Sequence, residues 1–182
     1  MDRKTKIVTV FGSSQSEENS KEYKIAYELG KMLAEAGYVI CNGGYGGVME
    51  ATAKGAKDGG GKSIGVITEY FNRRANRYIS EVIQVKTLVD RLLKLIELGD
   101  AYVVLKGSTG TLVELSMVWE YMNKSVIKEK PIILIGEFWL PVVNTLKKEL
   151  IHEGLEEVTK FITFVKSPFE CVNSLKSKLN LM

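Results

Sequence analysis

One stretch, residues 106–114 with the sequence KGSTGTLVE, combines residue types that bind anions with one that does chemistry. It follows an apolar run at 101–105 that is typical of a buried parallel strand, and it leads into apolar residues at helical spacing. The backbone N–H groups of such a loop and of the helix N-terminus converge, which suits a phosphate. Glu114, predicted in the first turn of that helix, is either a charge at the helix end or a catalytic group.

Two other strand-to-helix connections, residues 12–16 and 42–47, are also rich in small residues. In a parallel sheet the carboxyl ends of the strands share one edge, so all three loops are expected there. Tight turns need glycine in any protein, so one such loop would decide little. Three loops on one edge favour an anionic ligand. The residues predicted to bind its phosphate and the rest of the substrate are Gly12, Ser13, Ser14, Gly43, Gly44, Gly46, Gly47, Gly107, Ser108, Thr109, Gly110 and Thr111.

Arg91 is the next candidate. It is predicted about one turn into a helix over 88–98, from which its side chain can reach the same edge. Periodicity alone slightly favours the alternative, a surface arginine paired with Asp90 or Glu97.

Further basic side chains, Arg73, Arg74 and Arg77, lie in a polar loop between two predicted strands. They could form a flap that gathers anions, but the polarity of the loop favours the other interpretation, solvated arginines. His152 lies in a polar stretch remote from the strand ends, so we do not expect it to act in catalysis.

The common nucleotide signatures do not fit. The first loop lacks a GxGxxG run and no acid ends the second strand, so dinucleotide binding is not expected. Residues 56–63, AKDGGGKS, nearly spell a P-loop. A P-loop joins a strand to a following helix, whereas here a helix leads in and a strand leads out, so ATP or GTP hydrolysis is not predicted.

The elements that must position these loops follow from the spacing of apolar residues. The expected strands cover 7–11, 38–41, 63–67, 81–85, 101–105, 131–135 and 161–165, and the intervening segments have helical spacing, including 48–57, 88–98 and 138–150. In the helix over 88–98, the residues expected to face inward are Leu88, Leu92, Leu95 and Ile96. The predicted fold is α/β, one domain over residues 1–182 with a doubly wound, Rossmann-like parallel sheet and helices on both faces.

Composition excludes several other classes of protein. Of the 182 residues, 45% are hydrophobic and 26% charged, as in ordinary globular proteins. The net charge of +3 is too small to argue for a nucleic-acid or membrane surface. Cys41 and Cys171 are isolated, so neither a disulfide framework nor a metal site is expected, and a cytoplasmic location is predicted.

Taken together, these motifs resemble the LONELY GUY (LOG) family of Rossmann-like phosphoribohydrolases. The family's central motif, PGGxGTxxE, is similar to residues 106–114, although Lys106 and Ser108 replace the proline and the second glycine. The family's first loop resembles VFGSS at 10–14, and its second loop resembles GGYGGVM at 43–49.

The family's second signature, MHxRK, falls on LVDRL at 88–92, where only the arginine is retained. The resemblance therefore implies that Arg91 and Glu114 are catalytic residues. It also implies a homodimer, with contacts from the helices near both residues. The face with Met117, Trp119, Tyr121 and Met122 is equally compatible with a dimer contact and with a monomer core.

The activity that the resemblance implies is hydrolysis of the N-glycosidic bond of a nucleoside 5′-monophosphate, such as cytokinin riboside 5′-monophosphate or AMP, without a cofactor or metal. A second branch with this fold is similar to the molybdenum-cofactor carrier proteins and binds an anionic pterin without hydrolysing it. The older label for the family, lysine decarboxylase, would need a Schiff-base lysine with partners for pyridoxal phosphate, and no such arrangement is present in the sequence.

Overall fold

A computed structural model describes residues 5–179 of the chain. Seven strands form one sheet in the order β4-β3-β2-β1-β5-β6-β7, and every neighbouring pair is parallel. The strands are β1 (Ile7–Phe11), β2 (Val39–Asn42), β3 (Ser63–Thr68), β4 (Glu81–Val85), β5 (Ala101–Val104), β6 (Ile132–Ile135) and β7 (Ile162–Val165). All seven predicted strands are therefore present, with bounds that shift by one residue in several cases.

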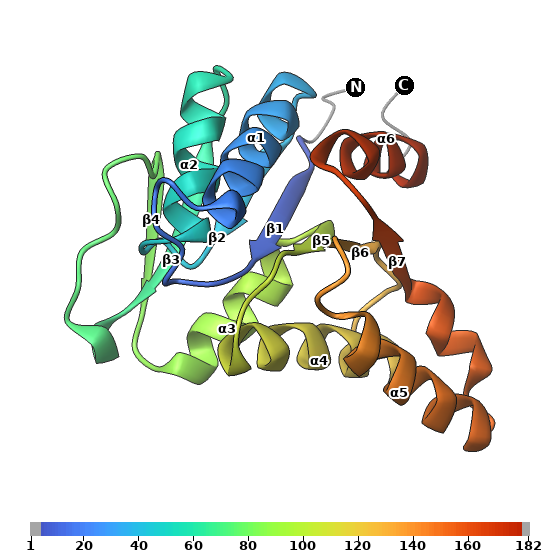
Figure 1. The fold of residues 1–182 in the computed structure, drawn as a ribbon. Helices are drawn as coiled ribbons and strands as arrows, with labels where there is room; N and C mark the ends of the chain where they lie inside the picture. The colour runs from blue at the N-terminus through green and yellow to red at the C-terminus, as the bar shows by residue number, and fades with distance from the viewer. Residues whose placement is uncertain (1–4, 180–182) are drawn as a thin grey trace.

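Within residues 5–179, six α-helices and two short 3-10 helices lie between the strands or, for the last helix, after them. They are α1 (Lys21–Glu35), α2 (Val48–Asp58), α3 (Leu88–Leu98), α4 (Thr109–Asn123), α5 (Leu140–His152) and α6 (Pro168–Lys178), with η1 (Glu69–Phe71) and η2 (Glu156–Phe161). Figure 1 shows α1, α2 and α6 on one face of the sheet and α3, α4 and α5 on the other. The predicted fold class, a doubly wound parallel sheet covered on both faces, is confirmed.

Two hydrophobic clusters, one on each face, hold the layers together. Strand residues alternate between them: Val8 and Val10 of β1 pack under α1, α2 and α6, whereas Phe11 and Cys41 belong to the cluster under α3 and α4. Such alternation is what a strand covered on both faces requires. Both cysteines are buried and free.

The strand order fixes where a ligand can bind. From β1 the chain moves outward to β4 and then returns to the other side of β1 with β5. The loops that follow β1 and β5 therefore diverge to opposite faces and leave a crevice between them, at the carboxyl ends of the strands. The predicted phosphate loop, which follows β5, lies at this switch point.

The structure corrects three details of the expected helices. Leu88 does not face inward, because it is the first residue of α3 and stays 43% exposed. Helix α5 begins at Leu140 instead of residue 138. Helix α4 begins at Thr109, with no acid in its first turn, so Glu114 lies in the second turn.

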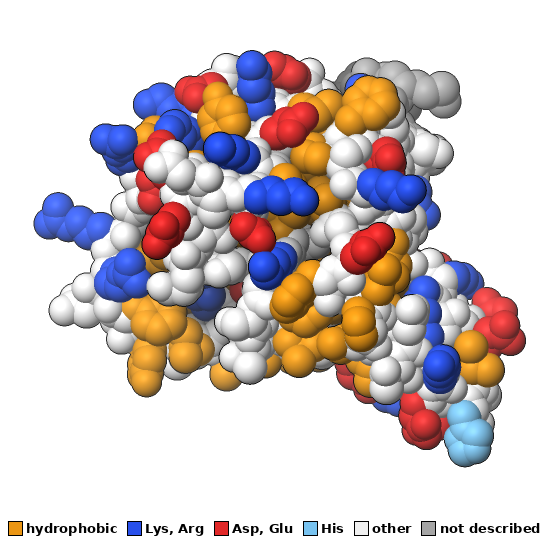
Figure 2. Space-filling view, in the orientation of Figure 1, with side chains coloured by type: hydrophobic (Ala, Val, Ile, Leu, Met, Phe, Trp, Pro, Cys, Tyr) orange, Lys and Arg blue, Asp and Glu red, His pale blue; other side chains and the backbone are white. Residues whose placement is uncertain are grey.

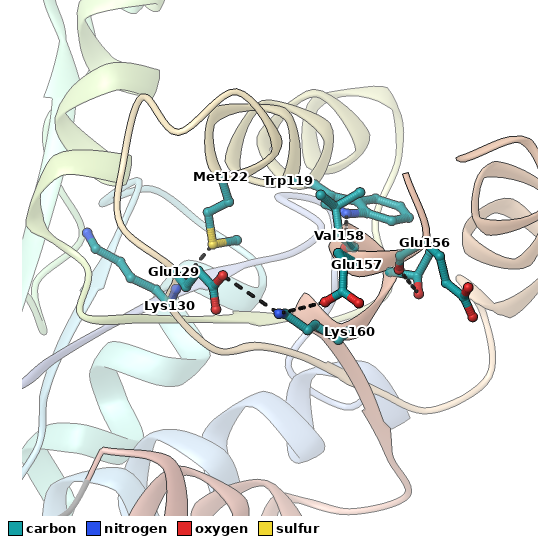
Figure 3. Close-up of polar contacts among 9 residues, drawn as sticks. Trp119, Met122, Glu129, Lys130, Glu156, Glu157, Val158 and Lys160 are labelled. Carbon is teal, nitrogen blue, oxygen red and sulfur yellow. Dashed lines mark hydrogen bonds and ion pairs between the residues drawn. The ribbon is translucent and has the colours of Figure 1, made fainter. Parts of the chain in front are cut away.

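Trp119 and Met122 of α4 are buried within the chain itself. The indole Nε1 of Trp119 donates a hydrogen bond of 2.9 Å to the carbonyl oxygen of Val158 in η2, and the Met122 Sδ lies 3.2 Å from the backbone nitrogen of Lys130 (Figure 3). Lys160 of η2 pairs with Glu157 at 3.1 Å. These two apolar side chains therefore belong to the core, which favours the monomer-core interpretation for that part of α4.

No helix within residues 5–179 is long and apolar enough to cross a membrane. On the face seen in Figure 2, basic and acidic side chains alternate around apolar surface instead of gathering into one basic patch. The chain's single histidine, His152 at the end of α5, lies at one extremity of this view.

Candidate functional site

A cavity of about 370 Å³ lies at the switch point between β1 and β5. All three small-residue loops contribute to it, together with α3, α4 and the segment after β3. Its lining residues are Gly12, Ser13, Ser14, Gln15, Tyr45, Met49, Phe71, Arg73, Arg91, Ser108, Gly110, Thr111 and Glu114.

The loop after β1 is tied by its backbone to the other two loops. The Ser13 N–H donates to the Lys106 carbonyl at 3.1 Å, and the Ser13 carbonyl accepts from the Val48 N–H at 2.8 Å. Gly47 has a φ of 65°, and a Cβ there would overlap the Ser13 carbonyl oxygen. Because no other residue fits that approach and that backbone conformation, Gly47 is what lets the first two loops close on each other.

The N-terminus of α4 opens into the cavity. Ser108 is the N-cap residue, but its side chain makes no capping hydrogen bond, and the first turn closes through the Leu112 N–H on the Ser108 carbonyl at 3.0 Å. The N–H groups of the residues before Leu112 have no acceptor inside the helix. Gly107 packs against the Thr111 hydroxyl, where a Cβ would overlap it. This end of α4 can therefore offer N–H groups and a hydroxyl to an anion.

Glu114 is half-buried on the cavity wall. Burial raises the pKa of its carboxyl from 4.5 to about 7, and the nearby Arg91 charge partly opposes this rise. The carboxyl is thus divided between its neutral and ionised forms near neutral pH. A group with such a pKa can accept or release a proton, or stabilise a developing positive charge once it is ionised.

Arg91 points into the site and not to the surface. Its Nε donates to the Val66 carbonyl at 2.9 Å, and its guanidinium lies 5.4 Å from the centre of the Tyr45 ring. Gly43 makes room for it, because a Cβ at that position would overlap Nη2 of the arginine. The guanidinium is therefore held by backbone and aromatic contacts from β3 and the second loop.

The alternative partners expected for Arg91 are engaged elsewhere. The Asp90 carboxylate accepts from the Thr87 N–H at 3.1 Å, while its own N–H donates to the Thr87 hydroxyl at 3.0 Å, which forms a capping box at the start of α3. Glu97 pairs with Lys94 at 2.6 Å. The interpretation of Arg91 as a paired surface arginine is wrong.

The structure places eight of the predicted site residues on the cavity wall, and the other six do not line it. Those on the wall are Gly12, Ser13, Ser14, Arg91, Ser108, Gly110, Thr111 and Glu114. Of the other six, Gly43, Gly47 and Gly107 fit tightly against Arg91, Ser13 and Thr111, as described above. Gly44 has a φ of 76°, a Cβ at Gly46 would make only an ordinary contact with the Ser14 carbonyl oxygen at 3.6 Å, and Thr109 is the first residue of α4.

Sequence reasoning missed four lining residues, Gln15, Tyr45, Met49 and Phe71, and favoured a solvated position for a fifth, Arg73. The first three lie within or beside the small-residue loops, so their position in these motifs could have identified them. Phe71 and Arg73 come from a loop without periodicity, which gives no such signal.

Lys106 does not line this cavity. Its Nζ pairs with Glu22 at 3.0 Å and lies 5.7 Å from the centre of the Phe138 ring, in a neighbouring cavity of about 210 Å³. Only its backbone carbonyl, which accepts from Ser13, takes part in the candidate site.

Comparison with known proteins agrees with this architecture. A cytokinin riboside 5′-monophosphate phosphoribohydrolase from Rhodococcoides fascians is 28% identical over 163 residues, which is 85% of this chain and 81% of that protein. A probable enzyme of the same name from Oryza sativa subsp. japonica is 32% identical over 134 residues, 71% of this chain and 58% of that protein.

Among solved structures, a molybdenum cofactor binding protein from Rippkaea orientalis superimposes with a TM-score of 0.77 at 24% identity, over 97% of this chain and 99% of that one. At this identity the likeness shows the fold alone. The SLOG cluster4 family matches residues 5–172, nearly the whole length of the chain. With its three-loop cavity and its LOG-like relatives, this chain belongs to the SLOG cluster4 family.

Proposed function

We propose that this protein hydrolyses the N-glycosidic bond of a nucleoside 5′-monophosphate to give the free base and ribose 5-phosphate. The observation that carries the proposal is that one carboxylate, Glu114, and one fixed guanidinium, Arg91, line the same cavity as the open N-terminus of α4. A phosphate site and a carboxylate within one cavity are what this reaction needs.

Each group then has a distinct role. The phosphate binds the N–H groups at the start of α4 and the Thr111 hydroxyl. As the bond to the base breaks, positive charge develops on the ribose, and the ionised Glu114 stabilises that charge. Glu114 also orients the water whose oxygen adds to the anomeric carbon, while the base leaves with the electron pair and takes up a proton. Arg91 favours the ionised form of Glu114 against the effect of burial.

The relatives support this reaction class, since the proteins from Rhodococcoides fascians and Oryza sativa carry the name of a cytokinin riboside 5′-monophosphate phosphoribohydrolase. The residues that line the cavity do not indicate which base the nucleotide carries. Tyr45, Phe71 and Met49 provide apolar and aromatic surface that suits a flat heterocycle of any kind.

A second candidate function is binding of a nucleotide or an anionic pterin without turnover. One observation favours it: Leu88 and Val89, at the positions of the Met and His in the LOG signature, are exposed apolar side chains that are not part of the cavity lining. A site without that histidine keeps its phosphate contacts but has fewer groups for chemistry.

Incubation with AMP, GMP, CMP and UMP, with separation of the released base, distinguishes the two candidates. We expect base from at least one nucleotide, none from the Glu114→Gln variant, and nucleotide affinity in that variant within a few-fold of the wild type. Full activity in Glu114→Gln would refute the role given to Glu114. Nucleotide binding without any base release would leave the carrier function.

We also propose that the protein is a homodimer that contacts its partner through α3 and the start of α4. The exposed apolar side chains on these two helices are Leu88, Val89, Leu93 and Val113. Burying such a patch is favourable by roughly 25 cal/mol per Å². Sedimentation analysis should give a dimer for the wild type and a monomer for Val89→Glu; a wild-type monomer at micromolar concentration contradicts the proposal.

A further inference from the structure

The groups described so far do not neutralise the full negative charge of a bound phosphate. A phosphate monoester carries roughly −1.5 to −2 charges at neutral pH. Arg91 is one cation of the cavity lining, but the Glu114 carboxylate offsets its charge when ionised. The Arg91 Nε is also committed to the Val66 carbonyl. Within residues 5–179 the cavity lining contains one more cation, Arg73.

Arg73 lies near the tip of a loop that is fastened at both ends to the site. At one end, the Thr68 N–H donates to the Tyr45 hydroxyl at 3.0 Å. At the other end, Asn76 Nδ2 donates to the Tyr45 carbonyl at 2.8 Å, and the Asn76 N–H donates to the Gly44 carbonyl, also at 2.8 Å. The tip between these two anchors is therefore held over the cavity, although its side chains are exposed.

The Tyr45 ring orders the side chains of this tip. Arg73 lies 5.5 Å from the ring centre, Arg91 lies 5.4 Å from it, and Phe71 packs edge-on at 5.5 Å. Both distances to the arginines are within the range of a cation–π contact. Tyr45 itself is buried. One fixed ring therefore keeps both guanidiniums at the same cavity.

Arg73 also remains available for a ligand. In the part of the chain that the structure describes, it forms no ion pair. Its contact with Tyr45 is weak for an exposed arginine, of a size that a charge-assisted bond to phosphate readily exceeds. The adjacent Arg74 differs: both arginines border a second cavity of about 330 Å³, but only Arg73 also lines the candidate site.

We propose that Arg73 binds the ligand and supplies the positive charge that its phosphate needs beyond the N-terminus of α4. The inference rests on the nucleotide-type ligand of the proposed function, but not on turnover. It assigns a specificity role to a loop outside the three small-residue loops, since this contact favours phosphorylated ligands over their uncharged nucleosides.

The test measures by calorimetry the binding of ribose 5-phosphate in the protein with Glu114 intact, and the binding of AMP in the Glu114→Gln background so that turnover does not consume it. The variants are Arg73→Gln, Arg73→Lys and, as the matched control, Arg74→Gln. We expect Arg73→Gln to weaken both ligands by about 10- to 100-fold, as loss of a charged hydrogen bond does. Arg73→Lys should recover part of the affinity, and Arg74→Gln should stay within about threefold.

A second measurement separates a direct contact from a general change of the loop. The affinity for AMP should fall more steeply with added salt when Arg73 is present than in Arg73→Gln, because the contact is ionic. Equal losses in Arg73→Gln and Arg74→Gln, or affinity in Arg73→Gln within twofold of its background, would overturn the inference. So would failure of the background proteins to bind either phosphate compound.

The outcomes also separate this inference from the proposed function. If the wild type releases no base, yet AMP binding depends on Arg73, the proposed hydrolysis fails and the role of Arg73 stands. If base is released and binding is independent of Arg73, the reverse holds.

Discussion

Replacing Glu114 with glutamine is predicted to stabilise the folded protein in mildly alkaline solution while it removes the proposed hydrolysis. Burial raises the pKa of this carboxyl from 4.5 to about 7 in the folded state. Below pH 4.5 the carboxyl is neutral in both states and contributes nothing. Between pH 4.5 and about 7 the unfolded chain releases the proton and the folded protein keeps it, so stability falls as the pH rises.

The size of the effect follows from the same two values. The interval from 4.5 to about 7, at about 1.4 kcal/mol per pH unit, gives a cost of about 3 kcal/mol that is complete above pH 7. Glutamine resembles the neutral acid and does not ionise. The difference in free energy of unfolding between variant and wild type should therefore grow by about 3 kcal/mol between pH 4.5 and 8.

Urea unfolding of both proteins at a series of pH values measures this difference. Any change in packing around Arg91 alters the difference in free energy of unfolding equally at every pH. The increase of this difference with pH therefore reports the titration of Glu114 alone. Glu120→Gln, an exposed position on the same helix, is the control, and its difference should change by less than about 0.5 kcal/mol. A flat difference for Glu114→Gln would refute the reasoning, because the carboxyl would then have the same proton affinity in both states.

Three further predictions test the parts that hold the site. Gly43→Ala should lower kcat/KM for base release by about 100-fold, because its Cβ would displace the Arg91 guanidinium; unchanged kinetics would show that the position of this arginine is unimportant. Thr87→Ala should reduce the free energy of unfolding by about 1 kcal/mol through loss of the capping box on α3, measured by urea unfolding; a change below about 0.3 kcal/mol would contradict this. Lys106→Ala should leave AMP affinity within about twofold, because its ammonium pairs with Glu22 outside the cavity; a tenfold loss in calorimetry would place it in the site.

The sheet and the general location of the site could be predicted from the sequence, for a physical reason. A strand buried on both faces is a short apolar run, and residues 101–105 or 132–135 allow few other interpretations. Once the strands are parallel, the loops at their carboxyl ends must meet, whatever the details of packing. Gly47 and Gly107 matter in the structure because of this meeting, where neighbouring backbone or side-chain atoms leave no space for a Cβ.

The positions of Arg73 and Phe71 could not be predicted, because nothing local determines them. The loop after β3 has no periodic pattern, and its place is fixed by Asn76 and Thr68, which bond to the second loop some 23 to 32 residues earlier in the chain. Likewise, the contacts of Arg91 with Val66 and Tyr45 join residues far apart in sequence. The spacing of apolar residues alone could not tell whether Arg91 lies on the surface or in the site. Its contacts in the folded chain place it in the site.

The corrected start of α4 explains how an acid and a phosphate can share one helix end. With Thr109 as the first helical residue, Glu114 lies beyond the first turn, so the N–H groups at the helix start remain open to an anion. Thr111 and Glu114 are three residues apart and therefore lie on one side of the helix, toward the cavity, while Leu115 and Val118 face the core. A carboxylate in the first turn would compete with the phosphate for the same N–H groups. Placed one turn later, it is set back from them and can act on the part of the ligand that extends beyond the phosphate.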